Sequence, residues 1–209
     1  MIDKPYDWDH YEDEWYNSPT YATQERELQE HFEGLKPKTV LEVGPGLGRV
    51  TKILVDMYPR AQFALADLSA AAITKTSEAI PDVDFSISVG SLQAAPPHNP
   101  VALANFPLLL AGASGFDLVV AVEVLMHIHP DLVPRAIANL LGALSTTRSA
   151  HGILITCDWT ESLPTSGGIP TPVRNSNYRH DYLDLFRLAG AKFGSRKVVG
   201  LQSIFVVQC

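Results

Sequence analysis

The sequence contains only two cysteines, Cys157 and Cys209, among its 209 residues. Two thiols cannot form the disulfide framework of a small secreted domain, nor a cysteine-rich zinc site. No apolar run approaches the ~20 residues that a membrane-spanning helix needs. The first residues, Met1 to Asp7, lack the basic and apolar regions of a signal peptide. We therefore expect a protein of the reducing cytoplasm.

Basic residues are also scarce, because 16 Lys and Arg stand against 23 Asp and Glu, for a formal net charge of −7. Proteins that follow nucleic-acid phosphates usually carry a basic face, so this charge argues against nucleic acid as a partner. A hydrophobic content of 46% and a mean hydropathy of +0.04 are typical of a soluble globular domain. The length predicts one domain, with room for a small appendage.

What the sequence does contain, after Pro37, is an alternation of apolar runs with amphipathic stretches. Ser69 is the expected N-cap of one helix, and the last residues predict an antiparallel hairpin that turns at Gly200. Strands that alternate with helices predict an α/β fold, doubly wound, with a mostly parallel sheet covered on both faces. We predict strands over 39–43, 63–66, 85–89, 116–122 and 152–156, helices over 23–32, 47–58, 69–79, 130–144 and 178–188, and the hairpin over 191–208.

One segment precedes this alternation and two interrupt it. Residues 1–36 form an aromatic, acidic segment that we expect to be a helical lid, and residues 37–209 form the α/β domain, with an insertion at 93–115. The stretch 160–176 contains three prolines and two glycines and is predicted to be a loop. The lid would close over a ligand and exclude water; alternatively, its aromatic residues anchor the segment on outer helices or on another subunit. The aromatic residues assigned to the lid are Trp8, Tyr11, Trp15 and Tyr16.

A glycine-rich turn lies between the first predicted strand and the helix that follows it. Its sequence is Glu42-Val43-Gly44-Pro45-Gly46-Leu47-Gly48, and Asp67 ends the second predicted strand. Glycines let a ligand approach the backbone, and the N-terminus of the next helix offers unpaired N–H groups. A carboxylate at the end of the second strand can accept both hydroxyls of a ribose. Together these residues predict a site for a cofactor that contains a nucleoside.

The turn is not a dinucleotide fingerprint, because Arg49 follows Gly48 where that fingerprint would place its third glycine. The pattern E-x-G-x-G-x-G, followed by Asp67, resembles class I S-adenosylmethionine-dependent methyltransferases. This resemblance covers roughly residues 38–208 and implies seven strands, with a terminal antiparallel hairpin. It also implies S-adenosyl-L-methionine as cofactor and S-adenosyl-L-homocysteine as product.

The resemblance assigns cofactor-binding roles residue by residue. The glycine turn would line the methionine and ribose portions, Asp67 the ribose hydroxyls, and Leu68 the adenine. Glu42 would orient the glycine turn or reach the amino-acid end through water, and Glu123 would face the cofactor or the substrate. Ser91 stands where many relatives have an aspartate, so it or the backbone alone would recognise the adenine amine. The full predicted set is Glu42, Gly44, Pro45, Gly46, Gly48, Asp67, Leu68, Ser91, Leu92 and Glu123.

Candidate catalytic residues follow the later strands. A neutral imidazole at His127 or His180 could take a proton from an acceptor hydroxyl or amine, and Asp158 could orient an amine. The alternative is that the histidines pack or cap helices and Asp158 belongs to a turn. His129 and Trp159 are expected to face the substrate. A metal site on His127, His129 and Asp158 is not expected, because two histidines at this spacing are common by chance.

The expected reaction is in-line transfer of the activated methyl group to an oxygen or nitrogen of a small molecule, which needs mainly positioning. Two alternatives remain. One is a protein or nucleic-acid methyltransferase, although the tetrapeptide of DNA amino-methyltransferases is absent because His98 follows Pro96-Pro97. The other is a protein that binds the cofactor without catalysis. A monomer and a homodimer are both compatible with the sequence.

Overall fold

The computed structural model describes residues 19–67, 69–89, 115–145, 152–159, 178, 180–200 and 202–208. The predicted lid residues Trp8, Tyr11, Trp15 and Tyr16 lie outside these ranges, as do Leu68, Ser91, Leu92, the loop 160–176 and nearly all of the insertion 93–115. Trp159 is described as part of a strand, but its side chain is not.

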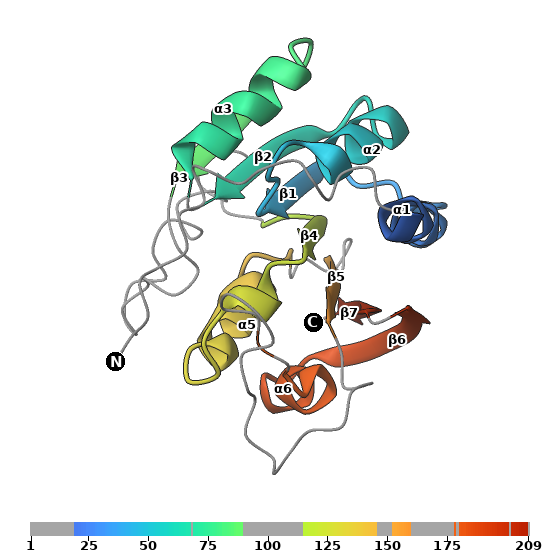
Figure 1. Cartoon of the computed structure of the whole chain (residues 1–209), viewed down its shortest axis with the longest axis vertical. Helices are drawn as coiled ribbons and strands as arrows, with labels where there is room; N and C mark the ends of the chain where they lie inside the picture. Colours follow the sequence, from blue (N-terminus) through green and yellow to red (C-terminus); the bar gives the residue numbers. More distant parts are fainter. Residues whose placement is uncertain are drawn as a thin grey trace.

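One mixed sheet organises the fold, and its strands run in the order β3-β2-β1-β4-β5-β7-β6. The first five strands pair in parallel, whereas β7 is antiparallel to both β5 and β6 (Figure 1). The predicted α/β sheet and the terminal hairpin are therefore confirmed. The strands are β1 (Thr39–Val43), β2 (Gln62–Asp67), β3 (Phe85–Val89), β4 (Leu118–Val122), β5 (Ile153–Trp159), β6 (Lys192–Val199) and β7 (Gln202–Gln208).

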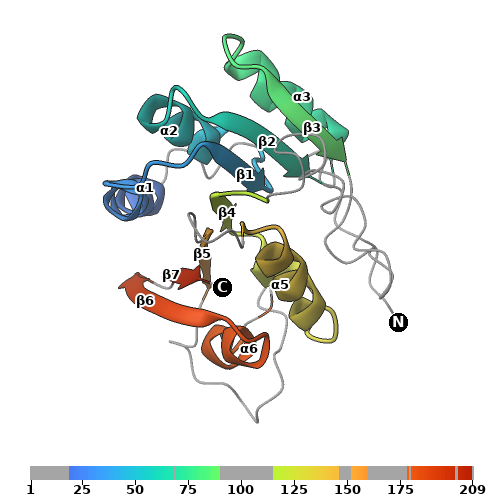
Figure 2. The same cartoon turned by 180° about the vertical axis from the view of Figure 1, so that it is seen from behind.

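Helices cover both faces of the sheet, as Figures 1 and 2 show from opposite sides. Helices α1 and α2 pack on one face and α5 and α6 on the other, while α3 packs beside β2 and β3. In the part of the chain that the structure describes, no helix is both long and apolar enough to cross a membrane. The helices are α1 (Pro19–Phe32), α2 (Arg49–Met57), α3 (Ala70–Ala79), the 3-10 turn η3 (Leu125–His127), α5 (Val133–Gly142) and α6 (Tyr182–Leu188).

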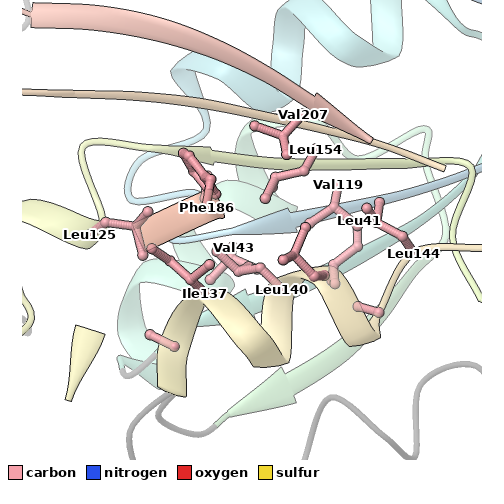
Figure 3. Close-up of a cluster of buried hydrophobic side chains, with 14 of the residues drawn as sticks. Leu41, Val43, Val119, Leu125, Ile137, Leu140, Leu144, Leu154, Phe186 and Val207 are labelled. Carbon is pink, nitrogen blue, oxygen red and sulfur yellow. The ribbon is translucent and has the colours of Figure 1, made fainter. Parts of the chain in front are cut away.

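Alternate residues of each strand supply two separate cores. Leu41, Val119 and Leu154 join Ile137 and Leu140 of α5 in the cluster drawn in Figure 3. Their strand neighbours point to the opposite face, because side chains alternate along a strand. There Val40, Val120 and Ile155 meet Leu28 and Phe32 of α1, which are fully buried. Helix α1 is therefore part of the packed domain.

Local sequence signals set several helix boundaries. Ser69 caps α3 as predicted, since its hydroxyl accepts the Ala72 N–H at 3.1 Å. Helix α5 begins at Val133, three residues later than the predicted Pro130, because residues 130–132 form a turn in which the Leu132 N–H donates to the His129 carbonyl at 2.8 Å. Periodicity alone cannot separate such a turn from the helix that follows it.

Candidate functional site

The glycine turn lies at the point where the order of strands reverses. Strand β1 pairs with β2 on one side and with β4 on the other, and the chain leaves β1 directly into residues 44–48. In open α/β sheets the loops at such a switch point separate and leave a crevice at the carboxyl ends of the strands. The fold thus places the turn where ligands bind.

The glycine turn is tightly packed at both ends and open in its middle. Gly44, Gly46 and Gly48 have φ of 69°, 58° and 87°, a region that only glycine adopts readily. An added Cβ would lie 2.5 Å from Val124 Cγ2 at Gly44 and 3.1 Å from Thr76 Cγ2 at Gly48, but it would meet nothing within 4 Å at Gly46. The Thr76 hydroxyl fixes the turn by donating to the Gly46 carbonyl at 2.9 Å. The turn is therefore packed at both ends, with open space beside Gly46.

Helix α2 begins without a side-chain cap. Its N-cap is Gly48, which has no side chain to accept the first N–H groups, whereas Ser69 and Asp181 cap α3 and α6 with side-chain oxygens. Uncapped N–H groups at the start of a helix attract negatively charged or hydrogen-bond-accepting ligands.

Two acidic residues predicted for this site lie at the ends of β1 and β2. Glu42 is buried on the α1/α2 face, and burial raises the pKa of its carboxyl to about 7. Asp67 is half-buried at the last position of β2, and one of its carboxylate oxygens accepts the Ser69 N–H at 2.9 Å. That bond fixes the orientation of the Asp67 carboxylate at the edge of the sheet.

Glu123 follows β4 in a backbone conformation that is unusual for its type. Its φ is 58°, and in the described part of the chain Glu123 is the only residue other than glycine with a positive φ. Such strain is frequent at functional sites, where surrounding contacts maintain it. Its carboxylate accepts from the Tyr21 hydroxyl at 3.2 Å and from the side-chain amides of Gln24 and Gln202. Helix α1 and strand β7 therefore hold Glu123 in place.

Gln24 is the centre of this polar cluster and is fully buried. Its Oε1 accepts from Arg49 Nη2 at 2.5 Å, and its Nε2 donates to Gln202 Oε1 at 2.6 Å. Arg49 also lies over the Tyr21 ring, with 4.3 Å from Cζ to the ring centroid, and pairs with Glu25 at 3.4 Å. The N-terminal helix is thus linked to both α2 and the carboxyl edge of the sheet.

Asp158 lies on the other face of the sheet, beneath η3. It is fully buried, and its Oδ1 accepts the Met126 N–H at 3.2 Å. Burial raises the pKa of Asp158 to about 8, which favours the protonated, neutral form of its carboxyl. Its contact is with the backbone of η3, the turn that ends at His127.

The three histidines near this turn differ in exposure. His180 is buried, its Nε2 lies 3.1 Å from the Leu125 carbonyl oxygen, and burial lowers the pKa of its imidazole. His127 is half-buried, and the side chain of His129 is 54% exposed beside Asp131. Tyr178 packs against the rings of both His129 and His180. Of the predicted catalytic residues, Asp158 and His180 therefore contact the same peptide group of η3, the one between Leu125 and Met126, and His127 is partly accessible.

Sequence reasoning missed the polar cluster of Tyr21, Gln24, Arg49 and Gln202. Arg49 was used only to exclude a dinucleotide site, and the glutamines gave no signal because a lone glutamine is usually a surface residue. No group of three His, Cys, Asp or Glu side chains within the described ranges is arranged to hold a metal ion.

Comparison with known proteins agrees with this geometry. A family model described as a methyltransferase domain matches residues 41–147. A malonyl-[acyl-carrier protein] O-methyltransferase of Anoxybacillus flavithermus is 36% identical over 50 residues, which make up 24% of this chain and only 19% of that protein.

Two solved structures share the fold over nearly the whole chain. The N-methyltransferase NodS of Bradyrhizobium japonicum WM9, in complex with S-adenosyl-L-homocysteine, matches with a TM-score of 0.68 at 14% identity, covering 96% of this chain and 93% of that one. The 1,6-didemethyltoxoflavin-N1-methyltransferase of Burkholderia thailandensis, with 1,6-didemethyltoxoflavin and S-adenosylhomocysteine bound, matches with a TM-score of 0.66 at 16% identity, covering 94% and 80%.

Proposed function

The chain belongs to the class I S-adenosylmethionine-dependent methyltransferases, and from this we propose that it methylates an oxygen or nitrogen atom of a small molecule. The observation that carries the proposal is the open space at Gly46, beside the uncapped start of α2 and at the switch point of the sheet. In the reaction, an acceptor lone pair bonds to the sulfonium methyl carbon, the carbon–sulfur bond breaks, and the acceptor loses a proton. The protein has to position both reactants and remove that proton.

The cofactor site that we propose is built by the glycine turn and by acids at the strand ends. Gly44, Pro45, Gly46 and Gly48 would contact the methionine and ribose portions, and Asp67 would accept the ribose hydroxyls. Leu68, Ser91 and Leu92, which lie outside the described residues, remain the proposed adenine contacts.

Replacing Asp67 with alanine is expected to weaken binding of S-adenosylhomocysteine at least tenfold, because each hydrogen bond to a charged acceptor contributes ~1.5–3 kcal/mol. Isothermal titration calorimetry measures the change. Asp56→Ala, which removes an exposed carboxylate from the far end of α2, is the matched control and should bind like the wild type. Equal affinities of all three proteins would rule out Asp67 as the ribose ligand.

For proton removal we propose His127, because it ends η3 at the carboxyl edge and is partly accessible. Asp158 and His180 would act through it, since both hold the backbone of η3. His129, Trp159 and the aromatic residues of segment 1–36 remain proposed substrate contacts.

Replacing His127 with alanine is expected to lower kcat at least tenfold while the Kd for S-adenosylhomocysteine stays the same. His180→Ala is expected to act first on stability, because it removes a buried ring and its bond to the Leu125 carbonyl. Steady-state kinetics and thermal melts of both variants separate the two roles. A His127→Ala protein that keeps full kcat on a protonated acceptor would contradict the assignment of the base.

A small-molecule acceptor is favoured over a macromolecule for two reasons. The net charge of −7 opposes nucleic acid, and a structural neighbour that covers most of the chain is named as a 1,6-didemethyltoxoflavin-N1-methyltransferase and has 1,6-didemethyltoxoflavin bound. The alternatives are a protein or nucleic-acid substrate, or cofactor binding without catalysis.

A turnover assay with panels of small-molecule, peptide and oligonucleotide acceptors tests the proposal. We expect formation of S-adenosylhomocysteine with at least one hydroxyl- or amine-bearing small molecule. Turnover confined to peptides or oligonucleotides would favour a macromolecular substrate. Intact S-adenosylhomocysteine binding with no turnover on any panel would favour a non-catalytic role.

A further inference from the structure

The polar cluster at the N-terminal helix connects two residues of opposite charge at the two ends of the glycine turn. Arg49 directly follows Gly48 at the turn's end, and Glu123 precedes Val124, the residue packed against Gly44 at the turn's beginning. A basic and an acidic residue thus lie next to the two ends of the turn.

Helix α1 bridges these two charges twice. The Gln24 amide accepts from Arg49 at 2.5 Å through Oε1 and donates to Glu123 at 3.4 Å through Nε2. Tyr21 donates its hydroxyl to the Glu123 carboxylate at 3.2 Å and places its ring under the Arg49 guanidinium. Both bridging residues lie on one face of α1, since they are three positions apart.

Of the two residues that contact both Arg49 and Glu123, Gln24 is the more deeply buried and makes a further bond. It is fully buried, whereas Tyr21 is half-buried. Its amide also donates to Gln202 Oε1 at 2.6 Å, and Gln202 in turn donates to Glu123. A buried amide that satisfies a cation, an anion and a second amide fixes all three, because each would be costly to leave without a partner.

We propose that Gln24 is a positioning residue of the cofactor site: it holds Arg49 and Glu123 at a fixed separation, so that together they recognise the zwitterionic amino-acid end of the cofactor. A carboxylate and an ammonium group at one end of a ligand match a guanidinium and a carboxylate held at the two ends of one loop. This inference rests on the proposed function and extends it, because it assigns part of the selectivity for the cofactor to the N-terminal helix.

The test compares two ligands, of which only one carries the zwitterion. S-Adenosylhomocysteine has the amino-acid end, and adenosine does not. Gln24→Met keeps the length and burial of the side chain but removes the amide; we expect it to weaken S-adenosylhomocysteine binding about tenfold or more and adenosine binding less than about twofold. Gln29→Met makes the same change at an exposed position of the same helix and should leave both affinities unchanged.

Circular dichroism and thermal melts show whether Gln24→Met folds. A second variant, Tyr21→Phe, tests the inference in case it does not. Tyr21→Phe keeps the ring under Arg49 but removes the hydroxyl that donates to Glu123. It should also weaken S-adenosylhomocysteine binding more than adenosine binding, which lowers the ratio of the first affinity to the second. The inference is overturned if folded Gln24→Met binds both ligands like the wild type, or loses both affinities equally. It is equally overturned if Gln24→Met does not fold and Tyr21→Phe leaves the ratio unchanged. A wild-type protein that binds neither ligand would instead contradict the proposed function.

Discussion

Gly46→Val is expected to reduce S-adenosylhomocysteine binding by about tenfold to a hundredfold, since overpacking a well-fitted space typically costs about 1–3 kcal/mol. In the structure, a Cβ at Gly46 meets nothing within 4 Å. The Cβ of the new side chain therefore has room in the free protein, and the side chain enters the space that we assign to the cofactor. Calorimetric titration measures the loss.

The control for this variant is Gly190→Val. Gly190 also has a positive φ, of 78°, and an added Cβ there also meets nothing within 4 Å, so the backbone strain of about 1–2 kcal/mol is matched. Gly190 lies between α6 and β6, and because β6 runs in the same direction as β5, this position is at the opposite edge of the sheet from the glycine turn. We expect similar losses of thermal stability in both variants and a loss of affinity only at Gly46. Equal affinities would show that the cofactor does not approach Gly46.

Asp158→Asn is expected to become more stable relative to the wild type as the pH rises. The pKa of Asp158 is raised to about 8 in the folded protein by burial, against about 3.9 in an unfolded chain. A raised pKa means that folding takes up a proton, so this residue's contribution to stability is complete at low pH and is lost as the pH rises toward 8. Asparagine keeps an oxygen for the Met126 N–H and never ionises.

The measurement is a double difference. We expect the free energy of unfolding of Asp158→Asn minus that of the wild type to grow by about 4 kcal/mol between pH 5 and pH 8, at ~1.36 kcal/mol per unit. Subtraction removes the groups that both proteins share, including Glu42, whose pKa is raised by burial to about 7, and His180, whose pKa is lowered by burial. Urea unfolding at several pH values supplies the data.

Asp131→Asn is the matched control, because it makes the same chemical change at a carboxylate that is 87% exposed. The effect of Asp158 is the change in unfolding free energy with pH that Asp158→Asn shows beyond the change that Asp131→Asn shows. A difference that stays flat from pH 5 to pH 8 would show that Asp158 is ionised in the folded protein, and would return it to consideration as a charged ligand for an amine.

Much of the fold could be predicted because its signals are local. Periodicity gave strands β1 and β3 with their observed bounds, and Ser69 marked the start of α3. The predicted bounds were wrong at β5, which runs to Trp159 instead of 156, and at α6, which begins at Tyr182 instead of 178. No prediction covered η3 either, where the chain leaves β4 through the strained Glu123. A φ of 58° at a glutamate is imposed by its partners in the fold, so the local sequence carries no sign of it.

By itself, the sequence determined where a cofactor loop would form. Three closely spaced glycines directly after a buried strand predict a turn whose backbone a ligand can approach. It also determined the layered α/β architecture, through the alternation of two hydrophobic periods. Only the tertiary structure decided what surrounds that loop. Gln24 meets Gln202 across 178 positions and Glu123 across 99, and burial in the folded protein is what raises the pKa of Asp158. Burial and long-range partners depend on the folded topology, and they determine the pKa values and the positions of the charged side chains near the site.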